Sequence, residues 1–389
     1  MSERQRANQP GTDGVAGSAA ARGSGHAVNL QLHWFLPGHG DGREVAKGAG
    51  RSVRREPDTG YLAQVAQAVD GLGFAGALVP FGLFCEDPWL VSAALAGGTR
   101  RLRFMVAVRP GLASPTLVAQ MCATFQRLSG GRLLLNVVTG SDADEQHRYG
   151  DWLDHEQRYE RTGEFLDVLR RSWAGTPFDF AGTHYRIAAG RLTRTHPVRP
   201  LVMLGGSSPA AHRVAARHAD VLLCWGEPPP SLAGVVKQVT ELADGYGRQL
   251  AFGTRFHVIS RDTSAEAWAV AQRLVAGMDP EVVAKAQQRF ARSESVGQRR
   301  AAALTGGGLD DLEVYPNVWA GYGLVRPGAA IALVGSHEEV ADRIEEYHAL
   351  GMAHLILSGQ PHLEEAYRFG EGVLPLLRER GVVATDGGS

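Results

Sequence analysis

The sequence predicts an α/β protein built as a (β/α)8 TIM barrel with insertions. From residue 28 onward, short apolar runs rich in β-branched residues alternate with segments whose apolar residues recur at helical spacing. This alternation is typical of parallel strands joined by helices that cover the sheet. The chain has 389 residues, of which 44% are hydrophobic, and this is enough for one large core. About eight strand–helix units over roughly 250 residues, plus insertions, match the size of such a barrel.

The expected strands are short runs that begin or end near glycine, proline or charged residues. They cover residues 28–35, 77–80, 102–108, 132–138, 201–204, 221–224, 252–260, 331–334 and 354–357. Helices are expected from about Gly60 to Gly73, near Pro88, from Pro115 to Leu128, and up to about Trp173. Two later helices begin with capping boxes, Thr263 with Glu266 and Ser336 with Glu339.

Two segments interrupt this rhythm. Residues 177–187 alternate aromatic and polar side chains and predict a hairpin. Residues 279–327 form an insertion, which in a compact barrel usually serves as a mobile lid or binding loop, with a purely structural insertion as the alternative. The expected organisation is a disordered tail over 1–27, a barrel domain over 28–378 and a flexible tail over 379–389.

The totals exclude several classes of protein. A formal net charge of −1 gives no reason to expect binding to nucleic acid or to an anionic membrane. No apolar run approaches the roughly 18 residues that span a bilayer. The three cysteines cannot form a paired framework and match no zinc spacing, and the scattered histidines form no metal constellation, so no metal site is expected. A cytoplasmic protein is expected.

The strand around residues 254–261 carries the strongest local signal. Side chains alternate along a strand, so Arg255 and His257 point to one face and Phe256 and Val258 to the other. A buried guanidinium is costly unless it meets an anion. The pattern therefore predicts either an internal ion pair with an acidic residue from a neighbouring strand, or a pocket for an anionic substrate with His257 close to the chemistry.

A glycine-serine run follows the strand 201–204 and precedes a helix. Gly206, Ser207 and Ser208 could form a phosphate cradle from backbone amides and hydroxyls, or Ser207 or Ser208 could be a plain helix N-cap. By contrast, the G-x-G-x-x-G motif at residues 71–76 ends a helix and leads into a strand. This order is the reverse of the dinucleotide-binding motif, which we therefore exclude.

Other polar residues follow the predicted strands, at the end where barrel enzymes keep their chemistry. His155 and Tyr159 are spaced to share one face of a helix, although such a pair is often only surface decoration. Cys85 is either a reactive or a packing residue. The remaining candidates at these strand ends are His39, Asn136, Thr139, Gly140 and Trp225.

Taken together, these segments resemble the FMNH2-dependent alkanesulfonate monooxygenases, which are two-component enzymes of the bacterial luciferase-like superfamily. The resemblance spans residues 28–377. It is carried by Trp34-Phe-Leu-Pro37, His39-Gly-Asp-Gly42, Cys85-Glu-Asp, Asn136-Val-Val-Thr-Gly-Ser-Asp142, Leu153-Asp-His155, Arg158-Tyr-Glu160, Gly205-Gly-Ser-Ser208, Trp225-Gly-Glu-Pro-Pro229, Arg255-Phe-His257, Asn317-Val-Trp-Ala-Gly321, Gly323-Leu-Val-Arg326 and Pro361-His-Leu-Glu-Glu-Ala-Tyr-Arg368.

The resemblance implies cleavage of an alkanesulfonate to an aldehyde and sulfite, using FMNH2 and O2. It also implies a separate NAD(P)H-dependent FMN reductase as partner, and we expect a homo-oligomer. By position, the catalytic residues would be His39, Cys85, Trp225, Arg255, His257 and Arg326. The flavin would lie along Asn136, Thr139, Gly140, His155 and Tyr159, with its phosphate at Gly206, Ser207 and Ser208.

The sequence departs from the family pattern where Gln360 stands in place of a tyrosine, since glutamine can form hydrogen bonds but cannot titrate. Leu83 and Phe84 are also more apolar than the usual pair before the cysteine. These changes leave three alternatives open: monooxygenation of a sulfone or sulfinate, a deazaflavin-dependent dehydrogenase on the same barrel, and a non-catalytic flavin-binding protein.

Overall fold

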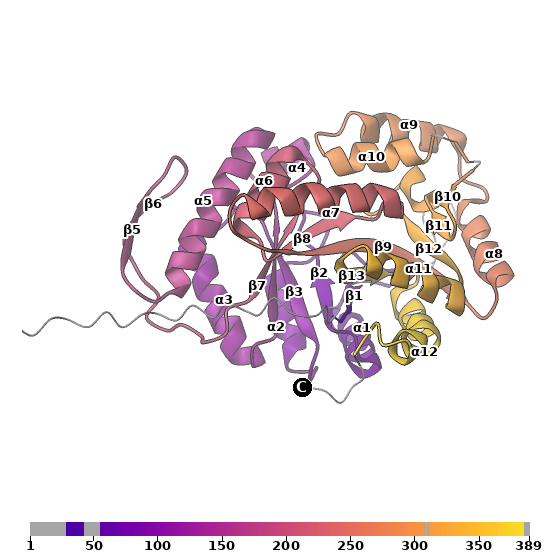
Figure 1. The fold of residues 1–389 in the computed structure, drawn as a ribbon, viewed down its shortest axis with the longest axis horizontal. Coiled ribbons are helices and arrows are strands. Elements are labelled where there is room, and N and C mark those ends of the chain that lie inside the picture. The colour runs from indigo at the N-terminus through magenta and orange to yellow at the C-terminus, as the bar shows by residue number, and fades with distance from the viewer. Residues whose placement is uncertain (1–28, 43–54, 307, 310, 385–389) are drawn as a thin grey trace, which may run out of the picture.

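The computed structural model describes residues 29–42, 55–306, 308–309 and 311–384. Eight parallel strands close into a barrel, because each strand pairs with the next and β9 pairs with both β8 and β13 (Figure 1). The barrel fold predicted from the sequence is confirmed. Its strands are β1 (Gln31–Phe35), β2 (Gly76–Val79), β3 (Arg103–Val108), β4 (Leu133–Val138), β7 (Leu201–Gly205), β8 (Val221–Trp225), β9 (Ala251–Arg261) and β13 (Met352–Ser358).

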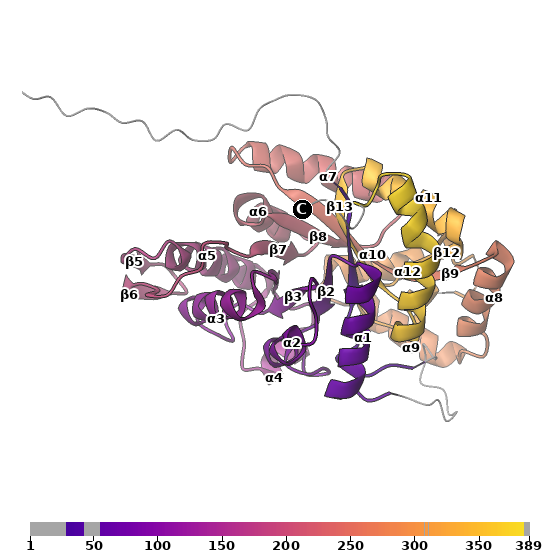
Figure 2. The ribbon, with the colours of Figure 1, turned by 90° about the horizontal axis from the view of Figure 1, so that it is seen from below.

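Helices surround this barrel in the order that the sequence predicts (Figure 2). Most begin at a side chain that accepts a hydrogen bond from a free backbone amide of the first turn, and both predicted capping boxes, at Thr263 and Ser336, are confirmed. They are α1 (Thr59–Leu72), α2 (Pro88–Ala96), α3 (Pro115–Ser129), α4 (Ala143–Arg148), α5 (His155–Trp173), α6 (Pro209–His218), α7 (Pro229–Asp244), α8 (Ser264–Val275), α11 (His337–Ala349) and α12 (His362–Glu379). In the described part of the chain, no helix is long and apolar enough to cross a membrane.

One strand-like run lies outside the barrel. β12 (Ala332–Ser336) pairs with the second half of β9, whereas β8 pairs with its first half. β9 is eleven residues long and passes beyond the end of β8, so its free edge continues into β12, β11 (Val318–Trp319) and β10 (Glu313–Tyr315). This extension has its own apolar core, which includes Ile259, Trp319 and Val334.

The two predicted excursions are regular structures. β5 (Phe178–Ala181) and β6 (Arg186–Gly190) form the predicted hairpin, which projects beside α5 (Figures 1 and 2). The insertion over 279–327 contains α9 (Pro280–Ala291), α10 (Val296–Leu304), β10, β11 and the 3-10 helix η1 (Gly321–Leu324).

The expected tails differ in part from the structure. The tail predicted over 1–27 lies outside the described residues. The tail predicted from residue 379 is wrong for its first residues, because α12 continues to Glu379 and both Val382 and Val383 are buried. The amide of Leu30 donates a hydrogen bond to the carbonyl of Val382 at 2.9 Å, so this segment packs against the entry to β1.

The barrel interior is apolar at mid-height and polar at both ends. The central layer contains Phe35, Leu78, Met105, Leu134, Met203, Leu223 and Ile356. Nearer the N-terminal ends of the strands, buried His33 and His354 stack at 5.3 Å between ring centroids, with Nε2 of His33 3.0 Å from Nδ1 of His354. Burial lowers the pKa of His354 to about 4 and that of His33 well below its usual range, and the charge of Arg103 acts in the same direction.

We predict that this histidine pair makes the fold sensitive to acid. Below about pH 6.5 these two histidines bind protons in the unfolded chain but stay neutral in the folded protein. The contribution of the pair to the free energy of unfolding is therefore complete above this pH and decreases between about pH 6.5 and 4. His33→Gln should flatten the slope of unfolding free energy against pH by up to about 1.4 kcal/mol per pH unit. Urea denaturation between these pH values measures the slope. Equal slopes for wild type and His33→Gln would refute the prediction.

Candidate active site

Two arginines approach the C-terminal end of the barrel from different elements. Arg255 is paired with Trp225, the last residue of β8, and its guanidinium carbon lies 4.1 Å from the centre of the Phe35 ring. Arg326 follows η1, and its backbone amide donates to the carbonyl of Tyr322 at 3.1 Å. Burial lowers the pKa of Arg326 and brings that of Arg255 to about 9, and the charge of Arg326 contributes to the shift of Arg255.

Neither guanidinium forms an ion pair with a carboxylate of a described residue, so the internal ion pair considered for Arg255 is absent from this part of the chain. Both groups remain charged at neutral pH, and each raises the cost of burying the other. Two desolvated cations without a counterion at a strand end form a site for an anion.

Several other buried polar atoms near these arginines also lack a hydrogen-bond partner among the described residues. Such atoms are uncommon, and each costs about 1–3 kcal/mol. Tyr322 and His362 lie within electrostatic reach of Arg326. A ligand that accepts hydrogen bonds from some of these atoms and donates to others would remove this free-energy cost. The unpartnered atoms are Nε of Arg255, Nη1 of Arg326, Oη of Tyr322, Oε1 of Gln360 and Nδ1 of His362.

His257 uses both of its ring nitrogens. Nε2 lies 3.2 Å from the carbonyl oxygen of Ala329, which can only accept, so Nε2 carries the proton. Nδ1 lies 2.9 Å from Oγ of Ser358 and therefore accepts from this hydroxyl. The imidazole also stacks on Tyr322, with 4.0 Å between ring centroids and 20° between planes. Burial and the two arginines hold the pKa of His257 well below its usual range, so the ring is neutral and positions Tyr322.

Phe35 connects this cluster to the loop after β1. Its ring centroid lies 5.7 Å from that of His362 and 6.1 Å from that of His39. His39 in turn contacts Phe84 edge-on at 6.0 Å. The predicted residues His39 and Arg255 therefore lie around one aromatic ring, together with His362, which the sequence analysis did not single out.

Asp41 holds His362 in place. Its buried carboxylate accepts hydrogen bonds from the backbone amide of His362 at 2.7 Å and from the hydroxyl of Tyr61. Burial raises the pKa of Asp41 despite these donors. The motif His39-Gly-Asp-Gly42 pointed to this loop, but the role of the carboxylate depends on a contact more than 300 residues away along the chain.

Cys85 lies beside this loop, and a β-carbon added to Gly38 would be 3.6 Å from its own β-carbon. Its thiol lies 3.4 Å from the carbonyl oxygen of Gly82 and 3.5 Å from that of Pro80. Burial and the charge of Glu145 raise the pKa of Cys85 to about 12. The thiol is therefore neutral and acts as a weak donor, not as a thiolate nucleophile.

The second group of predicted residues meets at the end of β7. A β-carbon on Gly206 would be 2.6 Å from the hydroxyl of Tyr159, so only glycine fits beneath this ring. Burial raises the pKa of Tyr159, and hydrogen bonds with Thr139 and Ser208 partly offset this rise. Ser208 also caps α6 by accepting from the amide of Ala211 at 3.1 Å. The N-cap interpretation is thus confirmed for Ser208, while the hydroxyl of Ser207 has no hydrogen-bond partner among the described residues.

The rest of the predicted flavin-binding residues border this group. The rings of His155 and Tyr159 contact at 5.0 Å, so the predicted pair does share one helix face. Asn136 is buried near the end of β4, and its Oδ1 has no hydrogen-bond partner among the described residues. Gly140 has a φ of +88°, which glycine adopts without strain.

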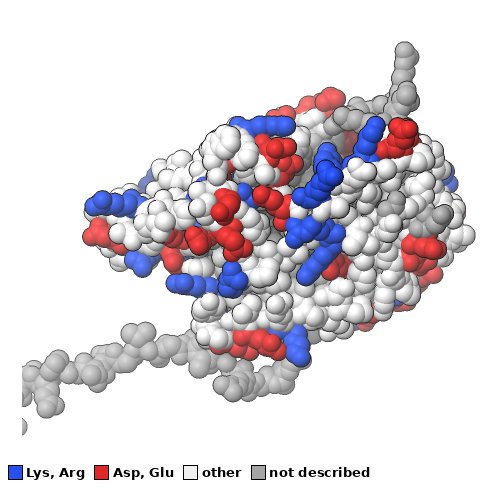
Figure 3. Space-filling view, turned by 90° about the horizontal axis from the view of Figure 1, so that it is seen from above, with Lys and Arg blue, Asp and Glu red and all other residues white. Residues whose placement is uncertain are grey.

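The insertion lies over this end of the barrel. A β-carbon on Gly297 in α10 would be 2.9 Å from Trp225 and 3.3 Å from the hydroxyl of Ser207, so α10 touches both predicted groups. Arg158 donates to Glu294 at 2.9 Å and joins the insertion to α5. Viewed from the side of α9 and α10, lysine and arginine side chains gather near the middle of the surface, with acidic ones around them (Figure 3).

The sequence and the fold match a known family of proteins. The chain belongs to the luciferase-like monooxygenase family, whose model matches residues 30–354. A riboflavin lyase, RcaE, crystallised with modified FMN and riboflavin, has 22% identity and a TM-score of 0.78 over 93% of this chain and 94% of that one. The EDTA monooxygenase EmoA of Chelativorans sp. BNC1 has 21% identity and a TM-score of 0.73, over 91% and 94%. An F420-dependent secondary alcohol dehydrogenase has 17% identity and a TM-score of 0.64, over 90% and 99%.

We predict that the unpaired arginines lower the stability of the ligand-free protein. Arg255→Met should raise its free energy of unfolding by about 1–3 kcal/mol, because it removes a buried charge that has no counterion. Sulfate should stabilise the wild type more than the variant, since only the wild type keeps both cations in addition to the general effect of this salt. Urea denaturation with and without sulfate measures both effects.

Arg273→Met, on the exposed face of α8, is the matched control and should change neither quantity. A loss of stability in Arg255→Met, or equal stabilisation of both proteins by sulfate, would contradict the prediction.

Proposed function

We propose that this protein is an FMNH2-dependent monooxygenase that cleaves the C–S bond of alkanesulfonates, giving an aldehyde and sulfite. The observation that carries the proposal is the pair Arg255 and Arg326, two buried guanidiniums without a carboxylate partner among the described residues. A sulfonate stays anionic at any physiological pH, so fixed cations are suitable partners for it. A neutral sulfone would leave both charges uncompensated.

The second group of residues fits a flavin mononucleotide. Gly206 lets the backbone pass close to Tyr159 and Ala211, which any β-carbon would meet, and Ser207 offers a hydroxyl at the start of α6, where backbone amides and the helix dipole favour phosphate. Asn136 presents a buried carbonyl oxygen that could accept from a ring N–H. Reduced FMN supplies two electrons for the activation of O2 when it is bound.

In this proposal, the chain binds and orients the sulfonate and controls water. Arg255 and Arg326 would hold the sulfonate oxygens, and Tyr322, fixed against neutral His257, would present its hydroxyl to the same pocket. Burial raises the pKa of Tyr322, so this hydroxyl is a donor at neutral pH. Gln360, in place of the family tyrosine, can accept or donate a hydrogen bond but cannot release a proton. The insertion would close over Trp225 and exclude water.

The remaining expectations are part of the proposal. A separate NAD(P)H-dependent FMN reductase would supply FMNH2, and O2 would be the second co-substrate. We also propose a homo-oligomer located in the cytoplasm.

A deazaflavin-dependent oxidoreductase is the second candidate. It is supported by the structural similarity to the F420-dependent alcohol dehydrogenase. Such an enzyme transfers a hydride and needs neither O2 nor a reductase. The cationic pocket favours the monooxygenase, because a neutral alcohol substrate would leave Arg255 and Arg326 without a function.

Sulfite release from a panel of alkanesulfonates, with FMNH2 generated under air by a generic reductase, tests the proposal. We expect sulfite in amounts that depend on chain length. Arg255→Ala should lower kcat/KM by about 10- to 100-fold, the equivalent of one charged hydrogen-bonded pair, while FMNH2 binding is retained. Arg273→Ala, at the exposed site on α8, should behave as wild type.

No sulfite from any alkanesulfonate despite tight FMNH2 binding would contradict the substrate class and would direct the next assay to sulfones. Reduction of a deazaflavin by an alcohol without O2 would support the second candidate. Failure to bind either flavin would overturn both.

The phosphate site gives a separate prediction. Ser207→Ala should weaken binding of FMNH2 by about 10-fold, because it removes one hydrogen bond to a dianion. Binding of reduced riboflavin, which lacks the phosphate, should stay unchanged. Ser207 is the suitable position because Ser208→Ala would also remove the cap of α6. Anaerobic fluorescence titration with the two flavins measures both affinities. An equal loss of affinity for FMNH2 and reduced riboflavin would show that Ser207 does not contact the phosphate.

A further inference from the structure

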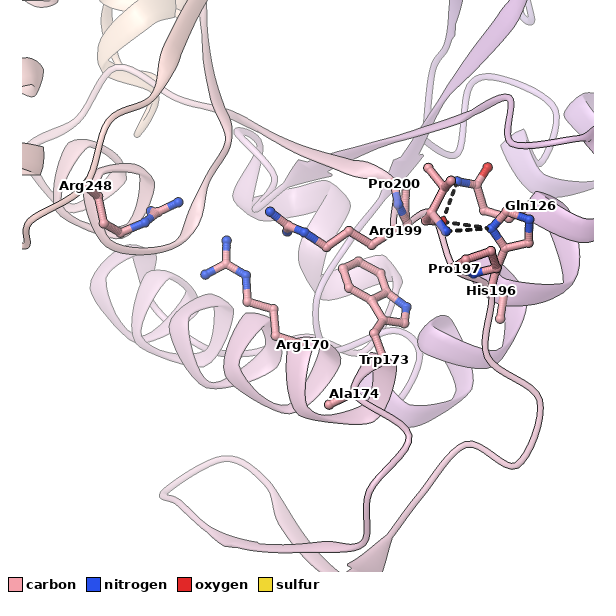
Figure 4. A pocket seen from close by; sticks show the side chains of 11 residues that line it. Gln126, Arg170, Trp173, Ala174, His196, Pro197, Arg199, Pro200 and Arg248 are labelled. Carbon is pink, nitrogen blue, oxygen red and sulfur yellow. Dashed lines mark hydrogen bonds between the residues drawn. The ribbon is translucent and has the colours of Figure 1, made fainter. Parts of the chain in front are cut away.

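A cleft of about 500 Å³ lies at the opposite end of the barrel from the candidate active site (Figure 4). It is formed by α3, by the end of α5, by the segment 196–200 that leads into β7, and by Arg248, which precedes β9. Because these segments precede their strands, the cleft is at the N-terminal ends of β7 and β9. Gly206 follows the other end of β7, and Arg255 lies level with the C-terminal end of β8.

Three guanidinium groups point toward one space in this cleft, those of Arg170, Arg199 and Arg248 (Figure 4). Asp220 lies 3.1 Å from Arg199 and 3.9 Å from Arg248. Asp167 also acts on Arg170, so three cations face two carboxylates and an excess of about one positive charge remains. Burial lowers the pKa of Arg170, and the two other arginines add to this shift.

Part of this cluster has a structural role. Arg248 donates to the carbonyls of Ala216 and Ala219 at 3.1 and 2.8 Å, and Arg170 donates to that of His218, so both cap the C-terminal end of α6. Arg199 caps no helix; both of its terminal nitrogens donate to the carboxylate of Asp220, at 3.4 and 3.1 Å, and its side chain is half exposed. Nε of Arg170 is buried without a partner among the described residues. Capping and the ion pairs with Asp220 therefore leave the exposed part of Arg199 and an excess of about one positive charge available to a ligand.

The rest of the cleft is mostly apolar, although Gln126 and His196 also line it. The indole ring of Trp173 lies between the guanidiniums and the proline-rich segment (Figure 4). Its Nε1 is buried and has no acceptor in the described part of the chain. Ala123, Ala174, Pro197 and Pro200 complete this surface. An aromatic ring can stack on such a surface at little cost in entropy.

We propose that this cleft binds a planar aromatic phosphate ester of the mononucleotide class. The phosphate would lie among the three guanidiniums, and the base would stack on the face of Trp173. This binding site is distinct from the proposed flavin site and does not depend on it.

Calorimetric titration of the whole protein with AMP tests the proposal, with adenosine and inorganic phosphate as separate probes. We expect AMP to bind more tightly than either probe, because each carries only half of the recognised chemistry. Arg199→Ala should weaken AMP binding at least 10-fold without loss of the α6 cap, and Trp173→Leu should weaken it similarly. Arg213→Ala, at an exposed ion pair on α6, should have no effect.

Three results would overturn the proposal. One is no heat of binding with AMP at about 10 mM, where a millimolar site would be nearly filled. Another is phosphate binding as tightly as AMP, which would show an anion site only. The third is a combination of two findings: FMN displaces AMP, and Arg199→Ala binds AMP as tightly as the wild type does. Together they would show that AMP binds at the candidate active site and not in this cleft. Circular dichroism confirms that both variants fold.

Discussion

The site at the barrel mouth depends on one electrostatic constraint, which is that two guanidiniums are buried near each other without an ion pair to any carboxylate of the described residues. A single charge in this position would be costly, and a second of the same sign increases the cost. The fold must therefore supply the stability elsewhere, through the apolar layers inside and outside the barrel. Such an arrangement is suited to binding an anion, because a bound anion would offset the free-energy cost of burying the two charges.

The register of β9 makes this arrangement possible. Its first half closes the barrel and places Arg255 level with the end of β8, while its second half leaves the barrel and pairs with β12. The chain between β11 and β12 carries η1, Tyr322 and Arg326 back over His257. One long strand thus joins the catalytic end of the barrel to the insertion, so the second cation arrives from a different element than the first.

The sequence predicted the barrel, the order of its helices and both capping boxes, because these follow from periodicity and local hydrogen bonding. It also indicated that Arg255 and His257 share a face, since alternation along a strand is strict. It could not show that Ile331–Val334 pairs outside the barrel, because an apolar run has the same pattern in either position. Asp41, Tyr322 and His362 were missed as site residues for a related reason. Their roles depend on contacts between segments that are distant in sequence, such as the Asp41 carboxylate with the amide of His362.

The histidines around the arginines follow the same electrostatic logic. Burial and the two cations keep His257 and His362 neutral, so neither adds a third positive charge at neutral pH. A neutral imidazole has one donor and one acceptor nitrogen, and His257 uses both to connect Ser358 and Ala329. The charge of the pocket then comes from the arginines and from the Asp41 carboxylate, which acts on Arg326, and the histidines do not change it at neutral pH. Constant charge suits a ligand that does not titrate, and a sulfonate has this property, whereas a carboxylic acid or a phosphate monoester changes its charge within or near that range.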